Sequence, residues 1–262
     1  MWTTTKLTDK AKILSFLESD RGYAAYLIGD LEPALYADCT WLGAARESRR
    51  VEALTLHYRG LDPPAFVLMG HAEGLRAILS HPLAPRRVYL TCRPERLDLA
   101  RAFYAWDEIT PMWRMVLDPA RLPPVRAVPD DVMLAPLRPA HLAQINELFV
   151  MGGGLAFSPA QVELGVFYGV LHAGALAAVA GTHLVSESYG VAAIGNVFTH
   201  PDYRGRSYAT LATAAVAGEL LRRGIRTVVL NVAQDNAPAL HVYDKLGFAR
   251  YCPFLEGPAT KR

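Results

Sequence analysis

The second half of the chain alternates between apolar runs of strand length and apolar positions at helical spacing. The runs typical of strands lie at residues 132–138, 166–171, 175–185, 191–199, 226–232 and 248–254. Helical spacing falls at residues 139–151, 208–223 and 236–246, and Pro159 after Ser158 predicts a further short helix. The order β-α-α-β-β-β-α-β-α-β contains a strand–helix–strand unit from Val191 to Val232, whose two strands should be parallel.

The first half shows a similar order of elements. Predicted helices lie at residues 8–18, 21–29, 73–80 and 95–104, and predicted strands at 41–46, 51–58, 65–69, 87–92 and 110–117. A first strand is not recognisable. A proline-rich stretch from Asp118 to Asp130 separates the halves, because proline removes backbone donors and favours extended chain. We therefore expect a diverged internal repeat, with domains at residues 1–125 and 126–262.

The segment 204–209 lies between the predicted strand 191–199 and the predicted helix 208–223. Backbone N–H groups at a helix N-terminus have no partner within the helix, and the helix dipole favours negative charge there. The small residues Gly205 and Ser207 let a ligand approach the main chain closely. This segment therefore predicts a site for a ligand that carries a pyrophosphate.

The first half differs at the corresponding place. There the predicted strand 65–69 is followed by Gly70-His71-Ala72-Glu73-Gly74, which has no arginine-glycine loop. Glu73 near the start of the next predicted helix would repel phosphate. We therefore expect a single cofactor site in the whole chain, and we expect it in the second half.

Composition narrows the class of protein. With 262 residues, of which 52% are hydrophobic and 20% charged, the chain should bury a sizeable core. The net charge of +2 and the scattered arginines give no basis for nucleic-acid binding. Three widely spaced cysteines fit a reducing cytoplasm and predict no metal site. The N-terminus lacks a signal-peptide core, and no apolar run has the length of a membrane span.

Three segments, taken together, resemble the GNAT superfamily of acyl-CoA-dependent N-acyltransferases. They are the strand and turn Asn196-Val197-Phe198-Thr199-His200-Pro201-Asp202-Tyr203, the loop Arg204-Gly205-Arg206-Ser207-Tyr208-Ala209, and the end motif from Asn236 to Phe248 with Ala239, Tyr243 and Gly247. The resemblance covers residues 130–255, and the first half resembles only a degenerate copy of the fold. It implies an α/β (α+β) class: tandem, mixed, mostly antiparallel twisted sheets with flanking helices and one parallel βαβ crossover at the cofactor site.

The resemblance also implies the residues that bind acetyl-CoA, without a metal. The expected contacts are Val197, Phe198, Thr199, Arg204, Gly205, Arg206, Ser207, Tyr208, Ala209, Thr210, Asn231, Asn236 and Tyr243. The backbone N–H of Val197 is expected to stabilise the oxyanion when an amine attacks the thioester. Tyr243, which shares a helix face with Asn236, is expected to protonate the leaving thiolate.

Two positions depart from the family's pattern. Ser207 stands where the loop usually has glycine, and serine suits this place unless the position needs a positive φ. The strand before the loop has no glutamate to act as general base for the amine. Glu187 is the first candidate for that role, followed by His183, Glu163 and Tyr189. A solvent route without a dedicated base is an equal alternative.

We therefore expect a cytoplasmic N-acetyltransferase, monomeric or homodimeric, that moves an acetyl group from acetyl-CoA to a primary amine by direct attack. The sequence does not specify the amine acceptor, and Gly152–Gly154 is expected as a hinge on the acceptor side. An acyl-CoA-binding regulatory module without turnover is the main alternative, which Ser207 and the missing glutamate favour. A third alternative, aminoacyl transfer from a charged tRNA, is disfavoured by the near-neutral charge. We expect neither a nucleic-acid nor a membrane partner.

Overall fold

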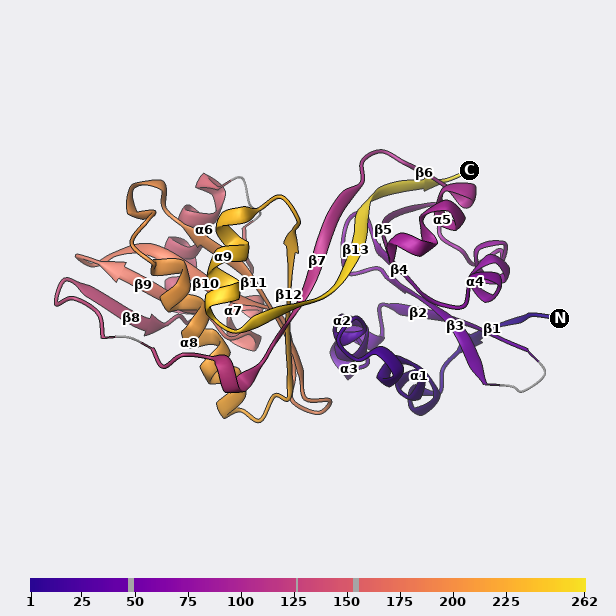
Figure 1. Cartoon of the computed structure of the whole chain (residues 1–262), viewed down its shortest axis with the longest axis horizontal. Coiled ribbons are helices and arrows are strands. Elements are labelled where there is room, and N and C mark those ends of the chain that lie inside the picture. Colours follow the sequence, from indigo (N-terminus) through magenta and orange to yellow (C-terminus); the bar gives the residue numbers. More distant parts are fainter. Residues whose placement is uncertain (47–49, 126, 153–155) are drawn as a thin grey trace. The chain divides into compact units, whose positions relative to one another are not determined.

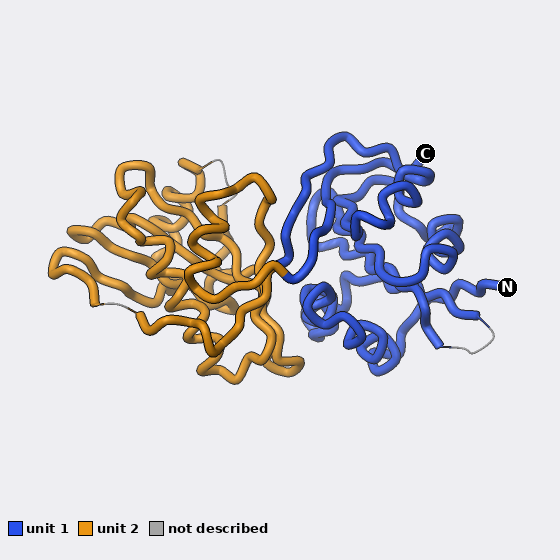
Figure 2. The backbone as a smooth tube through the Cα atoms, viewed as in Figure 1, with its two compact units in different colours: residues 1–114, 251–262 blue, residues 115–250 orange. Residues whose placement is uncertain are grey.

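The computed structural model describes residues 1–46, 50–125, 127–152 and 156–262. The chain divides into two compact units: unit 1 comprises residues 1–114 and 251–262, and unit 2 comprises residues 115–250 (Figure 2). Gly153 and Gly154 of the expected hinge, and Arg126 at the expected domain boundary, lie outside the described residues. Each unit has its own strands and its own flanking helices (Figure 1).

Unit 1 combines a mixed sheet with short helices. Its strands are β1 (Thr3–Leu7), β2 (Cys39–Ala45), β3 (Val51–Tyr58), β4 (Ala65–Gly70), β5 (Arg87–Cys92), β6 (Tyr104–Trp106) and the end of β13 (Phe248–Lys261). Its helices are α1 (Lys10–Leu17), α2 (Ala25–Gly29), α3 (Pro33–Tyr36), α4 (Ala72–Leu79) and α5 (Leu97–Phe103), with 3-10 turns at Glu18–Asp20 and Pro94–Arg96. The pairs from β1 to β4 are antiparallel, whereas β4 and β5 are parallel and are joined by α4.

Unit 2 is built in the same way. Its strands run in the order β8 (Val132–Pro136), β9 (Tyr168–His172), β10 (Ala175–Ser186), β11 (Val191–Thr199) and β12 (Thr227–Ala233). Its helices are α6 (Leu142–Met151), α7 (Pro159–Leu164), α8 (Tyr208–Arg222) and α9 (Ala237–Lys245), with 3-10 turns at Pro119–Arg121, Pro139–His141 and Pro201–Tyr203. β7 (Thr110–Leu117) leads from unit 1 into unit 2. The β11–β12 pair is parallel, as expected, and the pairs from β8 to β11 are antiparallel.

Local sequence explains how the helices of unit 2 pack. Ser158 caps α7 as expected, in a reciprocal capping box with Gln161. The buried face of α8 consists mainly of small side chains, including Ala212, Ala215 and Ala217. Small side chains allow α8 to lie close to β9, β10 and β11. A separate apolar cluster packs α6 and α7 on β10 through Leu137, Ile145, Leu148, Val162, Phe167 and Val179.

The two units repeat one order of elements. Unit 1 runs β1-α1-α2-β2-β3-β4-α4-β5-α5, with the short α3 added, and unit 2 runs β8-α6-α7-β9-β10-β11-α8-β12-α9. The strand that the sequence failed to reveal in unit 1 is β1, whose residues are half-buried or exposed and mostly threonine, so that no apolar run marks it. The mixed, mostly antiparallel class is confirmed. Unit 1 adds a second parallel crossover, which was not expected.

The last residues of the chain belong to unit 1. The predicted final strand ended at Phe254, whereas β13 continues to Lys261. Its second half pairs antiparallel with β5, for example Leu255 with Cys92, and then with β6. These hydrogen bonds tie residues 251–262 to unit 1, so that unit 1 contains both ends of the chain. The division between the units after Arg114 also precedes the boundary expected after residue 125.

Candidate cofactor and catalytic site

β11 and β12 separate before either strand ends. Their parallel pairing stops at Ile194 and Leu230, while the strands continue to Thr199 and Ala233. Two side-chain oxygens at these ends, Thr199 Oγ1 and Asn231 Oδ1, are buried without a hydrogen-bond partner. Buried polar atoms in folded proteins nearly always have a partner. The residues therefore fit a ligand that brings hydrogen-bonding groups into the gap between the strands.

β11 leads through the 3-10 turn at Pro201–Tyr203 into the loop before α8. Gly205 has a φ of +78°, and nothing lies within 4 Å of the place that a Cβ would take. Ser207 also adopts the left-handed region, with φ 63° and ψ 19°, and its side chain makes no cap hydrogen bond. Position 207 therefore needs the positive φ that makes serine unfavourable there. For a residue with a Cβ, this left-handed conformation costs about 1–2 kcal/mol. Because the Ser207 hydroxyl does not accept a hydrogen bond from the first N–H groups of α8, these groups can donate to a ligand.

A cluster of polar and aromatic side chains holds the first residue of α8. Tyr208 is 6% exposed, and its Oη lies 2.9 Å from His172 Nδ1. His172 Nε2 lies 3.6 Å from Asp131 Oδ2, and its ring centroid is 5.0 Å from that of Tyr203. The Arg206 guanidinium lies 5.5 Å from the centre of the Tyr203 ring. Sequence reasoning missed Asp131 and His172 because they come from the turn before β8 and from β9, far from the loop along the chain.

The end motif forms α9, with Asn236 at its N-terminal cap and Tyr243 within the helix. Asn236 Oδ1 accepts a hydrogen bond from the Ala239 N–H at 3.2 Å, so this side chain caps the helix. Tyr243, further along the same face of α9, is 7% exposed and packs edge-on against Phe248 at 6.0 Å between centroids. Burial raises the pKa of Tyr243 to about 12. The phenol therefore keeps its proton at neutral pH, as a general acid must.

The C-terminal part of the chain is similar in sequence to known proteins. Residues 153–248 match the sequence profile of the acetyltransferase (GNAT) family. The C-terminal part of this chain is a GNAT domain. The matched residues include β11, the loop before α8, and α9.

Individual relatives add to this picture. A mycothiol acetyltransferase of Rhodococcus opacus is 47% identical over 62 residues, which are 22% of this chain and 20% of that protein. The chain thus matches only about a fifth of that relative's length. Among solved structures, a tandem GNAT protein from the clavulanic acid biosynthesis pathway has a TM-score of 0.62 at 19% identity, with 100% of this chain and 98% of that chain covered. A Drosophila protein has a TM-score of 0.75 at 13% identity, with 97% of each chain covered. Identities this low show the fold alone, which extends over both units.

Two absences concern the described residues of both units. In this part of the chain no helix combines the length and apolar character needed to cross a membrane. The same residues include no group of three or more histidine, cysteine, aspartate or glutamate side chains placed to hold a metal ion.

The GNAT domain carries a histidine on the strand beside the opening. His183 Nε2 on β10 lies 3.1 Å from Asn196 Oδ1 on β11. Asn196 has a φ of 54°, and its side-chain amide donates to the Thr182 carbonyl at 3.3 Å. A Cβ on Gly195 would lie 2.3 Å from His183 Nε2, so the ring rests directly on the main chain of β11. This packing desolvates the imidazole and lowers the pKa of His183, although the residue keeps exposed surface.

The other base candidates lie elsewhere in the GNAT domain. Glu187 sits in the turn between β10 and β11, and its Oε1 is 3.6 Å from Arg223 Nη1 at the C-terminal end of α8. The 15 residues of α8 separate that end from the loop by about 22 Å, at 1.5 Å per residue. Tyr189 shares this turn, where its N–H donates to Ser186 Oγ at 3.2 Å, and Glu163 is exposed on α7. The structure therefore does not bring Glu187 to the opening.

Unit 1 has parallel strands at the corresponding place but lacks the loop. β4 ends at Gly70 and α4 begins at Ala72, so only His71 connects them. His71 Nδ1 accepts a hydrogen bond from the Glu73 N–H at 3.2 Å, which occupies an amide that a phosphate would need. Arg96 Nε donates to the Gly70 carbonyl at 3.0 Å, at the end of β4. These contacts use backbone groups of unit 1 at the place where unit 2 has its loop.

Proposed function

We propose that unit 2 is an N-acetyltransferase that moves the acetyl group of acetyl-CoA to a primary amine by direct attack. The observation that carries this proposal is the end of the β11–β12 pairing at Ile194 and Leu230, ahead of the loop at the start of α8. A gap between parallel strands, next to a helix N-terminus, suits a ligand that joins an amide-containing arm to a pyrophosphate. Coenzyme A has this construction.

Groups along the opening and the loop would hold acetyl-CoA. Thr199 Oγ1 and Asn231 Oδ1 offer hydrogen bonds to the pantetheine arm, beside the main chain of Val197 and Phe198. The N–H groups of the loop and first turn of α8 offer donors to the pyrophosphate, from Gly205, Arg206, Ser207, Tyr208, Ala209 and Thr210. The Arg204 N–H donates to the Pro201 carbonyl at 3.3 Å, so Arg204 would contribute its side-chain charge. Arg206 adds positive charge to this loop, and the Asp131–His172–Tyr208 contacts hold its end.

The protein's own groups would assist acyl transfer in two ways. Acetyl-CoA supplies a thioester carbonyl that an amine can attack, with cleavage of the C–S bond. The backbone N–H of Val197 donates a hydrogen bond to the oxygen on which negative charge develops. Tyr243 would donate a hydrogen bond, and then its proton, to the sulfur as the C–S bond breaks and negative charge develops there. The raised pKa of Tyr243, about 12, keeps this proton in place until then.

We assign the role of general base, which takes the proton of the attacking amine, to His183 in place of Glu187. His183 lies beside Asn196, the residue before Val197, whereas Glu187 lies at the far end of α8. A lowered pKa keeps the imidazole neutral near pH 7, the state in which Nε2–H donates to Asn196 Oδ1 and Nδ1 is the nitrogen that accepts a proton. Proton transfer to solvent without His183 is the competing route, and the pH dependence of the reaction distinguishes the two.

Unit 1 is, in this proposal, a degenerate copy of the same fold without a cofactor site. The repeated element order and the parallel β4–β5 pair support a common origin of the two units. The His71 cap and the contact of Arg96 with Gly70 support the loss of the site.

A second candidate is an acyl-CoA-binding regulatory module without turnover. The left-handed conformation of Ser207 favours it, because glycine would adopt the positive φ of position 207 without the strain that serine carries there. This candidate predicts acetyl-CoA binding by the same loop but no chemistry at Tyr243 or His183.

One experiment separates the two candidates. The full chain is incubated with acetyl-CoA and a panel of primary amines, including amino acids, diamines, amino sugars and peptide N-termini, while free thiol is measured. The enzyme proposal predicts amine-dependent thiol release that Tyr243→Phe suppresses. Acetyl-CoA binding without thiol release across the whole panel would favour the module.

A further inference from the structure

In unit 2, the proposed base and an aromatic ring lie next to each other on one face of the β10–β11 pair. In the strand register, Gly181 of β10 stands opposite Gly195 of β11. The ring of Phe167 rests on Gly181, where a Cβ would lie 2.2 Å from it, and the His183 ring rests on Gly195, where the distance would be 2.3 Å. Directly paired residues of antiparallel strands point to the same face of a sheet. His183 and Phe167 therefore share the face on which an amine must arrive if His183 takes its proton.

Phe167 belongs to a connected series of phenylalanine rings. The centre of the Phe157 ring lies 5.7 Å from that of Phe167 and 4.7 Å from that of Phe149. The Phe149 ring lies in turn 6.2 Å from the ring of Phe198, the residue that follows Val197. Phe167 is 2% exposed, whereas Phe149, Phe157 and Phe198 remain partly exposed. The series thus runs from beside the proposed base to beside the proposed oxyanion donor, and three of its rings keep surface that a ligand can cover.

Contacts with the main chain hold these rings in place. The side-chain amide of Asn146 on α6 accepts a hydrogen bond from the Phe157 N–H at 2.7 Å and donates one to the Phe157 carbonyl at 3.2 Å. The Phe198 ring packs on Gly152 at the end of α6, where a Cβ would lie 2.3 Å from it. The aromatic surface is therefore ordered before any ligand binds, which reduces the entropic cost of binding.

The side of α6 that bears Phe149 is apolar. It packs on the cluster beneath it through Leu142, Ile145, Leu148 and Phe149. The charged residue of α6, Glu147, is two positions from both Ile145 and Phe149, so it lies on the opposite side of the helix. Residues 153–155, outside the described part of the chain, are glycine, glycine and leucine and carry no charge. This surface therefore suits an apolar or aromatic group better than a charged one.

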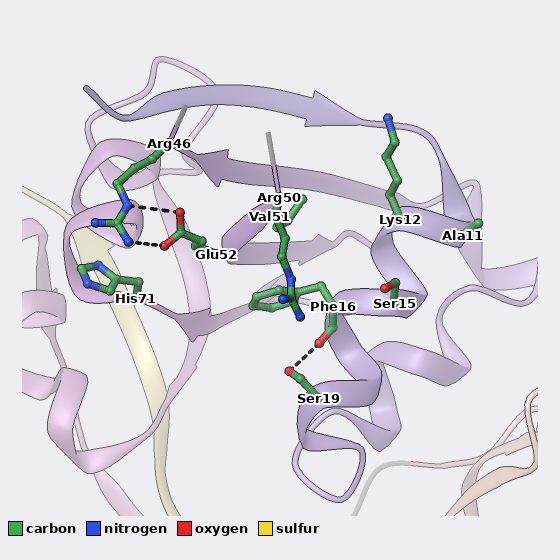
Figure 3. A pocket seen from close by; sticks show the side chains of 10 residues that line it. All are labelled: Ala11, Lys12, Ser15, Phe16, Ser19, Arg46, Arg50, Val51, Glu52 and His71. Atoms are coloured by element: carbon green, nitrogen blue, oxygen red, sulfur yellow. Dashed lines mark hydrogen bonds and ion pairs between the residues drawn. The ribbon is translucent and has the colours of Figure 1, made fainter. Parts of the chain in front are cut away.

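Unit 1 shows that the fold does not require an apolar surface beside its first helix. α1 and α6 occupy the same place in the repeated order of elements. α1 borders a cavity whose lining includes Lys12, Arg46, Glu52 and His71 (Figure 3). The Arg46 guanidinium forms two hydrogen bonds with the Glu52 carboxylate there, at 3.1 Å and 2.6 Å. The aromatic surface of unit 2 is therefore a property of its own sequence.

We propose that the amine acceptor of unit 2 carries an apolar group, preferably an aromatic ring, and that this group lies against Phe149, Phe157 and Phe198 while the amine lies at His183. The proposal rests on the N-acetyltransferase activity proposed above and specifies its acceptor. Phe198 follows Gly195 by three residues, which is about 10 Å along an extended strand. A ring joined to the amine through three carbon atoms has a comparable length.

Two acceptors that differ only at the end away from the amine test the proposal. 3-Phenylpropylamine and 3-amino-1-propanol have the same three-carbon chain, which ends in a phenyl ring or in a hydroxyl group. With the full chain and acetyl-CoA, kcat/KM from thiol release should be at least tenfold higher for the phenyl compound, because apolar surface leaves water. A ratio near one, or thiol release only from amines without an apolar group, would overturn this proposal and leave the proposed activity standing. No release from any amine would contradict both.

Variants at Phe149 test whether this surface causes the preference. Phe149→Asn should lower the ratio of the two kcat/KM values at least fivefold, whereas Phe149→Leu, which stays apolar, should keep most of it. The control is Met133→Asn, which changes an exposed methionine of β8, separated from β11 by β9 and β10. It should keep the wild-type ratio. Circular dichroism and the dissociation constant of acetyl-CoA establish that the variants fold. An unchanged ratio in Phe149→Asn, or an equal loss in Met133→Asn, would overturn the assignment.

Discussion

The imidazole Nε2 of His183 lies 3.1 Å from the side-chain oxygen of Asn196, where β11 leaves its regular path beside β12. Asn196 directly precedes Val197, the residue whose N–H we assign to the oxyanion. The contact thus places a titratable ring next to the centre of the proposed reaction. It also explains why residue 195 is glycine, since any side chain there would collide with the ring.

The first prediction concerns this ring. His183→Gln should lower kcat/KM by about 100-fold, the contribution typical of a positioned general base. In the wild type, kcat should fall as pH drops through the lowered pKa of His183, because protonation removes the base. The variant should lose this acid limb. Glu187→Gln, the matched control, should leave kcat/KM unchanged, and an unaltered pH profile in His183→Gln would favour the solvent route.

Gly195→Ala should reproduce the defect without touching the imidazole itself. The new methyl group would lie 2.3 Å from His183 Nε2, so the ring must move off β11. We expect kcat to fall at least tenfold while the dissociation constant of acetyl-CoA changes little, because the loop before α8 is not altered. Steady-state kinetics and isothermal titration on one preparation measure both. A weaker cofactor affinity with normal kcat would assign Gly195 to binding instead.

Tyr243→Phe should lower kcat by about 100-fold and leave acetyl-CoA affinity within about twofold, since general acid catalysis typically contributes at least that factor. The raised pKa, about 12, adds a second expectation. Because Tyr243 stays protonated below that value, the effect of the substitution should be constant from neutral pH to moderately alkaline pH. An unchanged kcat would remove Tyr243 from the acid role.

Ser207→Gly should stabilise unit 2 by about 1 kcal/mol, because glycine adopts a φ of 63° without the steric cost that serine carries. Ser207→Ala is the control. It keeps the strain, and since the hydroxyl makes no cap hydrogen bond, it should leave the free energy of unfolding nearly unchanged. Urea unfolding of the three proteins measures the difference. A stabilising alanine variant, or a destabilising glycine variant, would contradict this account of the loop.

Much of the fold follows from local sequence. The bounds predicted for β3, β5 and β11 agree with the structure, because each is a run of apolar or β-branched residues ended by turn-forming or polar ones. β1 and the end of β13 were missed for a different reason. Their residues are threonine-rich or interrupted by Pro253, Gly257 and Pro258, so their strand form depends on pairing with β2 and β5. Such distant pairing leaves no local signal.

The site shows the same limit. The loop, Asn236 and Tyr243 could be proposed from motifs, since motif residues keep a fixed spacing along the chain. The ranking of bases could not be derived in that way. Glu187 is nearer to β11 along the chain than His183, but the turn carries it to the far end of α8. The left-handed backbone of Ser207 was also hidden, because serine rarely adopts it.

The most direct test of the central claim is the dissociation constant of acetyl-CoA for Gly205→Glu, measured by isothermal titration against Gly224→Glu. Both glycines have a positive φ, 78° and 79°, and neither has an atom within 4 Å of a Cβ, but they lie at opposite ends of α8. A glutamate in the loop places charge and bulk where the pyrophosphate is proposed to bind. We predict that Gly205→Glu weakens acetyl-CoA binding at least 100-fold while Gly224→Glu binds as the wild type does. Retained affinity in Gly205→Glu would contradict the assignment of this loop as the acetyl-CoA site.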